Sequence, residues 1–421
     1  MNTENWKSIT IVGRQPALGI AELESLYGAV NVTAFGSQSC LVNEEASSVP
    51  FTRLGGSVKL ARILTPLPSV QWRDIESYLL KTVGEHAAYI PGKLTFGLSV
   101  YGLRISSKAV AATALQIKKV IKQSGHSVRM VPHKDVALSS AVVLHNHLTG
   151  PQGWELLVVS NGHQAYLAQT VHVQDIDAYT ARDQARPHRD AKVGMLPPKL
   201  AQIIVNLAVG QIKNDERRTT NDGAEPKIQD QSSKICVLDP FCGTGVLLQE
   251  AMLMDYDIYG SDLDPRMVQY TIDNLAWLDQ KYPHLGDYRR IEIGDATTHT
   301  WQLSGLGTQN SLLFVACETY LGKPLSTLPP SDMLSKIMYD VNLLHHKFLE
   351  NIGRQIPAGT RLCIAVPAWR GKREFLHLPI LDHLTDIGYT RMSFEHASFE
   401  ELIYHRENQV VARELVVLIK N

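Results

Sequence analysis

Three aspartates in the second half of the sequence each follow an apolar run, and a bend of small residues lies beside the first. The run ICVLDPFCGTGVLLQEAMLM starts at Ile235 and contains Asp239 and a loop with Gly243 and Gly245. A strand-to-helix turn without bulky side chains lets a ligand approach the backbone amides at the helix N-terminus. Such a turn is typical of sites for nucleotide-like ligands.

The other two aspartates extend this pattern. The next run, YDIYGSDLD, reaches Asp262 about 20 residues further on, a spacing at which a carboxylate accepts the ribose hydroxyls of a bound nucleoside. A third run, RIEIGDAT, ends in Asp295, which is in position to receive an adenine amino group. Each aspartate alone could instead cap a helix or form a turn. Together they predict a nucleoside cofactor site at the carboxyl edge of an open α/β sheet.

The elements that must position these residues follow a different pattern in each half of the chain. In the first half we expect helices at 17–27 and 107–123 among strands, an alternating α+β order, with strands at 8–13, 39–43, 59–64, 94–101, 126–132, 155–160 and 165–170. A helix starting at Pro197 and Pro198 opens the second half. The fold class predicted for the second half is α/β.

Composition shifts divide the chain into an N-terminal region 1–175, a charged linker 176–196 and a C-terminal domain 197–421. Within the last, residues 213–233 are polar, lack aromatic residues and are predicted to form a loop. The five cysteines are scattered, which predicts reduced thiols and neither a disulfide framework nor a metal site. No apolar run reaches the ~18 residues needed to span a bilayer and the start lacks a secretion signal, so we expect a cytoplasmic protein with no membrane partner.

A basic, acid-free stretch runs from Arg104 to Lys134, although the whole chain has a net charge of only −1. A polyanion would therefore be held by a local patch, and the candidate residues are Arg104, Lys108, Lys118, Lys119, Lys122 and Arg129. The apolar residues expected on the core-facing side of the helix are Val110, Ala111, Leu115 and Ile117. The alternative is a merely solvated helix face. In the linker, Arg182, Arg186 and Arg189 could contact phosphates, or instead cap helices or pair with Asp183 and Asp190.

The loop DPFCGTG followed by the two further acids resembles class I S-adenosylmethionine-dependent methyltransferases. The chain's end, ELIYHRENQVVARELVVLIK, is similar to the terminal antiparallel hairpin that closes their Rossmann-like sheet. The stretches GRQPALGIAELESLYG, RLGGSVKLA and AKVGMLPPKLAQIIVNLA further resemble the THUMP-bearing tRNA guanosine-N2 methyltransferases. This likeness implies a ferredoxin-like and THUMP RNA-binding region before the catalytic domain.

The resemblance implies S-adenosyl-L-methionine as cofactor and tRNA as partner. Asp239 and the turn Pro240, Phe241, Gly243, Thr244, Gly245 would bind the methionine end, Asp262 the ribose, and Asp295 with Ala296 the adenine. The implied reaction is methylation of guanosine N2 on a base flipped into the pocket. The sequence does not indicate whether a small activating subunit takes part.

The stretch LLFVACETYLGKP departs from the family, whose members carry Asp or Asn, two prolines and an aromatic residue at this place. One alignment puts Glu318 on the acid, to orient the acceptor amine, with Tyr320 near the base. The other puts Tyr320 on the aromatic residue and Cys317 on the acid, where a thiol is a poor acceptor. The lost prolines imply a looser loop. The rival functions are an RNA-binding protein with a decayed active site and an adenine-N6 methyltransferase.

Overall fold

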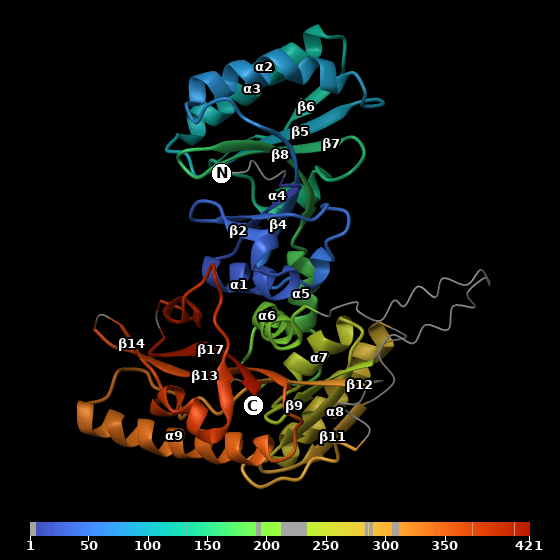
Figure 1. Cartoon of the computed structure of the whole chain (residues 1–421). Coiled ribbons are helices and arrows are strands. Elements are labelled where there is room, and N and C mark those ends of the chain that lie inside the picture. Colours follow the sequence, from blue (N-terminus) through green and yellow to red (C-terminus); the bar gives the residue numbers. More distant parts are fainter. Residues whose placement is uncertain are drawn as a thin grey trace, which may run out of the picture. The chain divides into compact units, whose positions relative to one another are not determined.

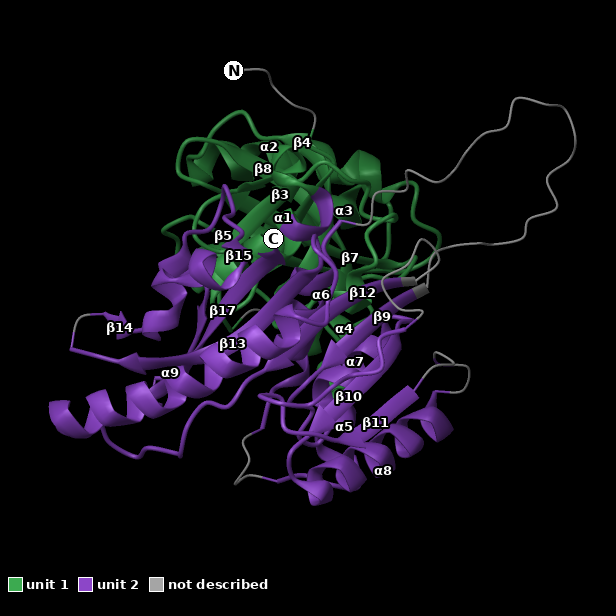
Figure 2. Cartoon of the chain, turned by 60° about the horizontal axis from the view of Figure 1, so that its bottom comes forward, with its two compact units in different colours: residues 1–24, 28–179 green, residues 25–27, 180–421 purple. Residues whose placement is uncertain are grey.

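The chain folds into two units, and the computed structural model describes residues 6–132, 134–190, 195–211, 234–282, 285, 289–304, 311–372, 374–407 and 409–421. The first unit comprises residues 1–24 and 28–179, and the second comprises residues 25–27 and 180–421 (Figure 2). The division at residue 179 falls within the stretch 176–196, where the structure has a helix, α5 (Ile176–Gln184). The predicted loop 213–233 lies outside the described residues.

The first unit is built on one mixed sheet. Its strands are ordered β2 (Val32–Ala34), β3 (Ser39–Val42), β1 (Ser8–Val12), β4 (Ser57–Pro66), β8 (Ala165–Val173), β7 (Gly153–Ser160), β5 (Leu94–Tyr101), β6 (Val128–Met130). The predicted strands are all present, with ends shifted by a few residues. Its helices are α1 (Pro16–Tyr27), α2 (Trp72–Ala87), α3 (Ser107–Gln123) and α4 (Ser140–His145).

Helices α2 and α3 lie side by side over one face of this sheet (Figure 1). Apolar residues one turn apart, such as Ile75, Leu79 and Val83 of α2, join Phe96 and Leu98 of β5 in a single buried cluster. The buried stripe of α3 is Val110, Thr113, Ala114, Ile117 and Ile121. The expectation that Leu115 faces the core was wrong: it lies on the other side of the helix and is 49% exposed.

Two of the N-terminal stretches that carry the family resemblance meet in this unit. Glu22 of α1 accepts hydrogen bonds from the backbone amides of Gly55 (2.9 Å) and Gly56 (2.8 Å). A Cβ atom on Gly56 would lie 2.3 Å from the Cα of Gly19, closer than side chains approach a backbone. The glycines therefore permit the close crossing of α1 and the segment before β4.

The second unit is a largely parallel sheet. Its strand order is β11 (Arg289–Ile293), β10 (Asp257–Asp262), β9 (Lys234–Asp239), β12 (Ser311–Glu318), β13 (Arg361–Arg370), β17 (Val411–Lys420), β15 (Tyr389–Arg391). The first five are parallel, whereas β17 runs antiparallel to both β13 and β15. The predicted α/β sheet with a reversed end is thus confirmed. The predicted first strand of the terminal hairpin is short, since β16 covers only Ile403–Tyr404.

Helices cover both faces of this sheet. Alternate strand residues, including Cys317 and Ile364, pack with Phe348 and Ile352 of α9 (Ser331–Gly353) in one core cluster. Helix α6 (Pro198–Val209) contacts β12, β13 and β17 and lies on the opposite side from α9 (Figure 1). Two further helices, α7 (Val246–Leu253) and α8 (Pro265–Lys281), connect the parallel strands β9, β10 and β11.

All five cysteines are buried and free. Among the described helices, none combines the length and the apolar character that crossing a bilayer would require.

Candidate cofactor and acceptor site

A cavity of about 610 Å³ opens at the carboxyl ends of the parallel strands of the second unit. This volume is within the usual range for small-molecule sites. The cavity is lined by the loops that follow β9, β10, β11 and β12, and it brings together predicted site residues that are far apart in sequence: Asp239, Pro240, Phe241, Gly243, Thr244, Asp262, Asp295, Ala296, Glu318 and Tyr320. Gly245 is not on the lining but forms the N-cap of α7.

Asp239 is a buried carboxylate on this lining, only 2% exposed. Its Oδ1 accepts a hydrogen bond from the backbone amide of Phe241 at 3.0 Å. Burial, together with the nearby charges of Asp262 and Glu318, raises the pKa of Asp239 well above its usual value, although the Phe241 bond opposes the rise. No cationic side chain of the described chain pairs with it. The site is therefore suited to a positively charged ligand group.

The glycine loop after β9 is held in place by α8. The Thr271 hydroxyl donates to the Gly243 carbonyl (2.9 Å), and the Asn274 amide donates to the Thr244 carbonyl (2.9 Å). Gly245 has a φ of +79°, and a Cβ atom there would lie 3.0 Å from the Thr271 side chain. A glycine is needed at this position for both reasons.

Asp262 ends β10 and fixes the other side of the loop. Its Oδ2 accepts from the Gly243 amide and its Oδ1 from the Asp264 amide, both at 2.9 Å. Burial raises the pKa of Asp262, and these two bonds oppose the rise. Leu263 follows on the cavity lining and is 69% exposed, so an apolar surface lies open to a ligand beside the carboxylate. Leu263 was not among the predicted site residues; its signal in the sequence is an apolar residue in the charged turn DLDP.

Asp295 is exposed and forms a local turn, in which its Oδ1 accepts from the backbone amide (2.9 Å) and the hydroxyl (2.7 Å) of Thr297. The neighbouring Ala296 carbonyl accepts a hydrogen bond of 3.0 Å from Asn351 of α9. Asn351 also donates to the His299 carbonyl at 2.9 Å. Helix α9 therefore holds the segment from Ala296 to His299.

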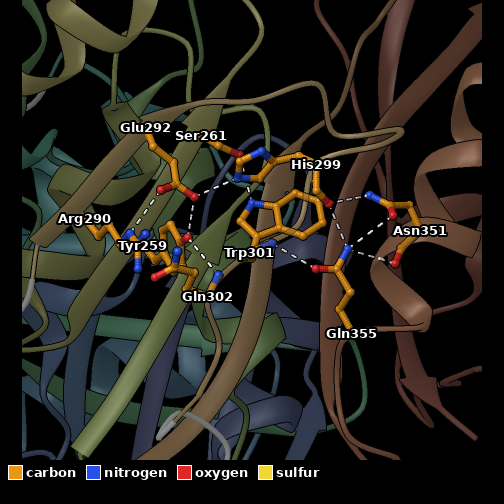
Figure 3. Close-up of polar contacts among 9 residues, drawn as sticks. All are labelled: Tyr259, Ser261, Arg290, Glu292, His299, Trp301, Gln302, Asn351 and Gln355. Atoms are coloured by element: carbon orange, nitrogen blue, oxygen red, sulfur yellow. Dashed lines mark hydrogen bonds and ion pairs between the residues drawn. The ribbon is translucent and has the colours of Figure 1, made fainter.

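A polar network supports this segment from the side of β10 and β11 (Figure 3). Glu292 receives hydrogen bonds from Tyr259 and from Arg290 (3.0 Å), and its Oε1 lies 2.7 Å from His299 Nε2. Burial opposes ionisation of Glu292, but the bonds from Tyr259 and His299 and the nearby Arg290 charge outweigh it and lower its pKa. Trp301 donates to the Ser261 hydroxyl at 3.0 Å. The loop after β11 is thus anchored at several points.

Glu318 is the last residue of β12, and its side chain lines the cavity while forming an ion pair with Arg413 of β17. Cys317 is fully buried in the core cluster and does not line the cavity. Of the two alignments of this loop, the structure therefore places the residue of the first, Glu318, at the cavity. Tyr320 is 42% exposed on the same lining.

The predicted looseness of this loop was wrong in one respect, because Thr319 is bonded on two sides. Its hydroxyl lies 2.7 Å from His345 Nε2 of α9 and 2.9 Å from the Ala365 carbonyl of β13, and its amide donates to that carbonyl at 3.0 Å. Burial lowers the pKa of His345 to about 4, so the ring is neutral at pH 7. Its Nδ1 donates to the Val341 carbonyl (2.8 Å), and Nε2 accepts from Thr319.

The predicted RNA-binding residues are in the first unit, apart from Arg186. Most are exposed, on or next to α3: Arg104, Lys108, Lys119, Lys122 and Arg129, with Lys118 half-buried. Arg186, in contrast, is only 4% exposed and has Asp183 as an ion-pair partner at 3.8 Å. Arg182 pairs with the buried Glu250 at 2.9 Å. Both arginines are engaged within the second unit. The Arg186–Asp183 pair is one that the alternative to phosphate contacts anticipated, whereas the Glu250 partner of Arg182 was not predicted.

Comparison with known proteins gives a partial match. No family model matches the chain. It is 39% identical over 95 residues to the tRNA (guanine(10)-N2)-dimethyltransferase of Methanothermobacter thermautotrophicus, covering 22% of each chain. It is 28% identical over 173 residues to the protein of the same name from Pyrococcus abyssi, covering 41% of this chain and 39% of the relative. The matched regions thus span well under two thirds of these curated relatives.

Among solved structures, TrmN from Thermus thermophilus is similar over 99% of each chain at 16% identity, with a TM-score of 0.48. The conclusion rests on the curated sequence relatives. They confirm, over part of the chain, the resemblance to tRNA guanosine-N2 methyltransferases that the DPFCGTG loop and the N-terminal stretches indicated.

Proposed function

We propose that this protein transfers a methyl group from S-adenosyl-L-methionine to the exocyclic N2 amine of a guanosine in tRNA. One observation carries the proposal: a single cavity at the carboxyl ends of parallel strands holds three aspartates, a glycine loop and Glu318. Ligands of open α/β sheets bind at this edge. The names of the curated sequence relatives support both the reaction and the tRNA substrate.

The residues on the lining fit this cofactor. Asp239 is a buried carboxylate with no cationic partner among the residues that the structure describes, which suits the ammonium group of the methionine end. Asp262 would receive the ribose, Leu263 would contact the adenine ring, and Asp295 with Ala296 would bind the adenine edge. When bound, the cofactor supplies an electrophilic methyl group on its positively charged sulfonium sulfur. Loss of the methyl group leaves this sulfur as a neutral thioether. The protein therefore contributes mainly position rather than acid catalysis.

On the acceptor side, the amine to be methylated has its lone pair delocalised into the base. A carboxylate that accepts a hydrogen bond from this amine favours its pyramidal form and can receive its proton. Glu318 lines the cavity and is assigned this role, while the exposed ring of Tyr320 provides a surface on which a flipped base can stack.

Reaching a base in folded tRNA requires contacts outside the cavity. The exposed basic residues on and near α3 are assigned to bind the tRNA backbone, so that the first unit serves as a THUMP-like RNA-binding region. Arg186 is left out of this surface because it is buried. The proposed location of the reaction is the cytoplasm.

The test is methylation of unmodified tRNA with labelled cofactor, followed by nucleoside analysis. Wild type should yield N2-methylguanosine, and Glu318→Ala should lower kcat by about 100-fold or more, since positioned acid–base groups contribute on that order. Methyl label in adenosine would instead show an adenine-N6 enzyme. Binding of tRNA without transfer would show a decayed active site, and equal rates for wild type and Glu318→Ala would remove Glu318 from the reaction.

A further inference from the structure

Arg413 is a charged residue on β17, in the otherwise largely apolar run VARELVVLIK. Its side chain is 9% exposed, and its Nε donates to Glu318 Oε1. In the described part of the chain this is its one side-chain hydrogen bond. Arg413 itself is absent from the cavity lining, whereas Glu318 is on it. Arg413 can thus reach the acceptor side of the cavity through Glu318.

The ion pair of Arg413 and Glu318 is expected to contribute little to the stability of the fold. Both side chains are largely buried, at 9% and 16% exposure, so each loses most of its hydration. Attraction between buried ions compensates this loss only partly, and apolar residues in their place are often as stable or more so. Because Glu318 lines the cavity, the ion pair can instead serve to orient a carboxylate toward a bound ligand.

We infer that Arg413 is a positioning residue for the methyl transfer, fixing the Glu318 carboxylate where it meets the acceptor amine. This inference rests on the proposed function. Arg413 engages one carboxylate oxygen, Oε1, and Oε2 has no protein donor in the described part of the chain. An oxygen on a fixed carboxylate is therefore left to accept the hydrogen bond from the base.

The Glu318–Arg413 pair also helps to hold the start of this loop, where the two prolines that follow the acid in the family are missing. Its first residue, Glu318, is bound by Arg413 of β17, and its second, Thr319, is bound by His345 of α9 and Ala365 of β13. Interactions with three other elements of the second unit thus restrain two successive residues. Such restraint matters because a misplacement of about 1 Å can cost on the order of 100-fold in rate.

The experiment is a double-mutant cycle on tRNA methylation. Arg413→Met should lower kcat by about tenfold or more in wild type, with less than about twofold change in cofactor affinity. In the Glu318→Ala background the same change should lower kcat no further, because Arg413 acts through Glu318. Arg413→Lys should restore part of kcat, since it keeps the charge but not the fixed Nε geometry.

Arg391→Met is the matched control. Arg391 pairs with Glu414, the neighbour of Arg413 on β17, at 2.8 Å, and neither residue lines the cavity. This variant should lower the melting temperature and leave kcat unchanged. The same melting measurement shows whether Arg413→Met folds. If it does not, kcat of Arg413→Lys, expected to lie below the wild-type value, tests the inference.

Two results would overturn the inference. Equal kcat losses from Arg413→Met with and without Glu318 would mean that Arg413 does not act through it, while the proposed function would stand. Wild-type kcat in Arg413→Lys and Arg413→Met would remove any role for Arg413 in the rate. Lack of transfer by the wild type itself would instead reject the proposed function, and this role with it.

Discussion

His345 shows how one buried residue links the candidate site to the pH dependence of folding. Its side chain is 1% exposed, and both ring nitrogens are engaged, by the Val341 carbonyl and the Thr319 hydroxyl. A second proton would place a positive charge on a ring that is shielded from water. Burial accordingly lowers the pKa of His345 from 6.5 to about 4.

Stability should therefore fall as the solution becomes acidic. The unfolded chain takes up the His345 proton below pH 6.5, whereas the folded chain does so only near pH 4, so stability contributed at pH 7 is lost between these values. The loss from this group should approach about 3 kcal/mol. Urea unfolding at pH 7 and pH 4.5 should show a smaller pH dependence for His345→Gln than for wild type.

The control is His346→Gln. His346 is the next residue of α9 but is 39% exposed at its side chain and pairs with Glu350 at the surface, 3.6 Å away. Its replacement should leave the pH dependence of unfolding as in wild type. An unchanged dependence in His345→Gln would contradict a neutral, buried His345.

Among the helices and strands, the sequence predicted those features that follow from the period of apolar residues and from the residue types at strand ends. Apolar patterning identified the strands of the first unit except the short β2, and acids after apolar runs identified Asp239, Asp262 and Asp295 at one cavity. Helix α2 could have been predicted as well, since its buried residues Ile75, Leu79 and Val83 recur every four positions.

The remaining features depend on contacts between distant segments, which no local pattern encodes. Glu318 and Arg413 are 95 residues apart, and Thr319 and His345 are 26 apart. Without knowledge of these partners, the absence of the family's two prolines after the acid predicts a loose loop. Leu115 was assigned to the core on local spacing, but the packing of α2 against α3 selects a different stripe.

The close crossing of α1 and the segment before β4 can be tested by substitution of its glycines. Gly56→Ala would place a Cβ atom 2.3 Å from the Gly19 backbone, so α1 and the segment before β4 must separate. We expect a loss of about 2 kcal/mol or more in unfolding free energy, as for other overpacked sites. Gly13→Ala is the control, because its nearest contact, the Gly56 carbonyl oxygen at 3.5 Å, is ordinary. Equal urea midpoints for both variants would contradict the close crossing.

Over the whole molecule, positive and negative charges nearly balance, but positive charge is concentrated in one stretch of the chain. The net charge is −1, yet residues 104–134 carry no acid, and the exposed side of α3 carries Lys108, Lys119 and Lys122. A near-neutral protein gains little from its overall field when it meets a polyanion, so a local surface must supply the attraction. Opposite this surface, the buried stripe of α3 fixes which lysines are exposed.

The salt dependence of tRNA binding tests this arrangement. Each lysine that contacts a phosphate releases counterions, so replacing Lys119 and Lys122 together by Gln should reduce the slope of log affinity against log salt by about 1.5. KM for tRNA should rise while kcat at saturating tRNA stays unchanged, because neither residue lines the cavity. The matched control replaces Lys336 and Lys347, exposed lysines of α9, and should keep the wild-type slope. Equal slopes for the α3 variant and wild type would move the tRNA-binding surface away from α3, since only residues that contact phosphates can alter this quantity.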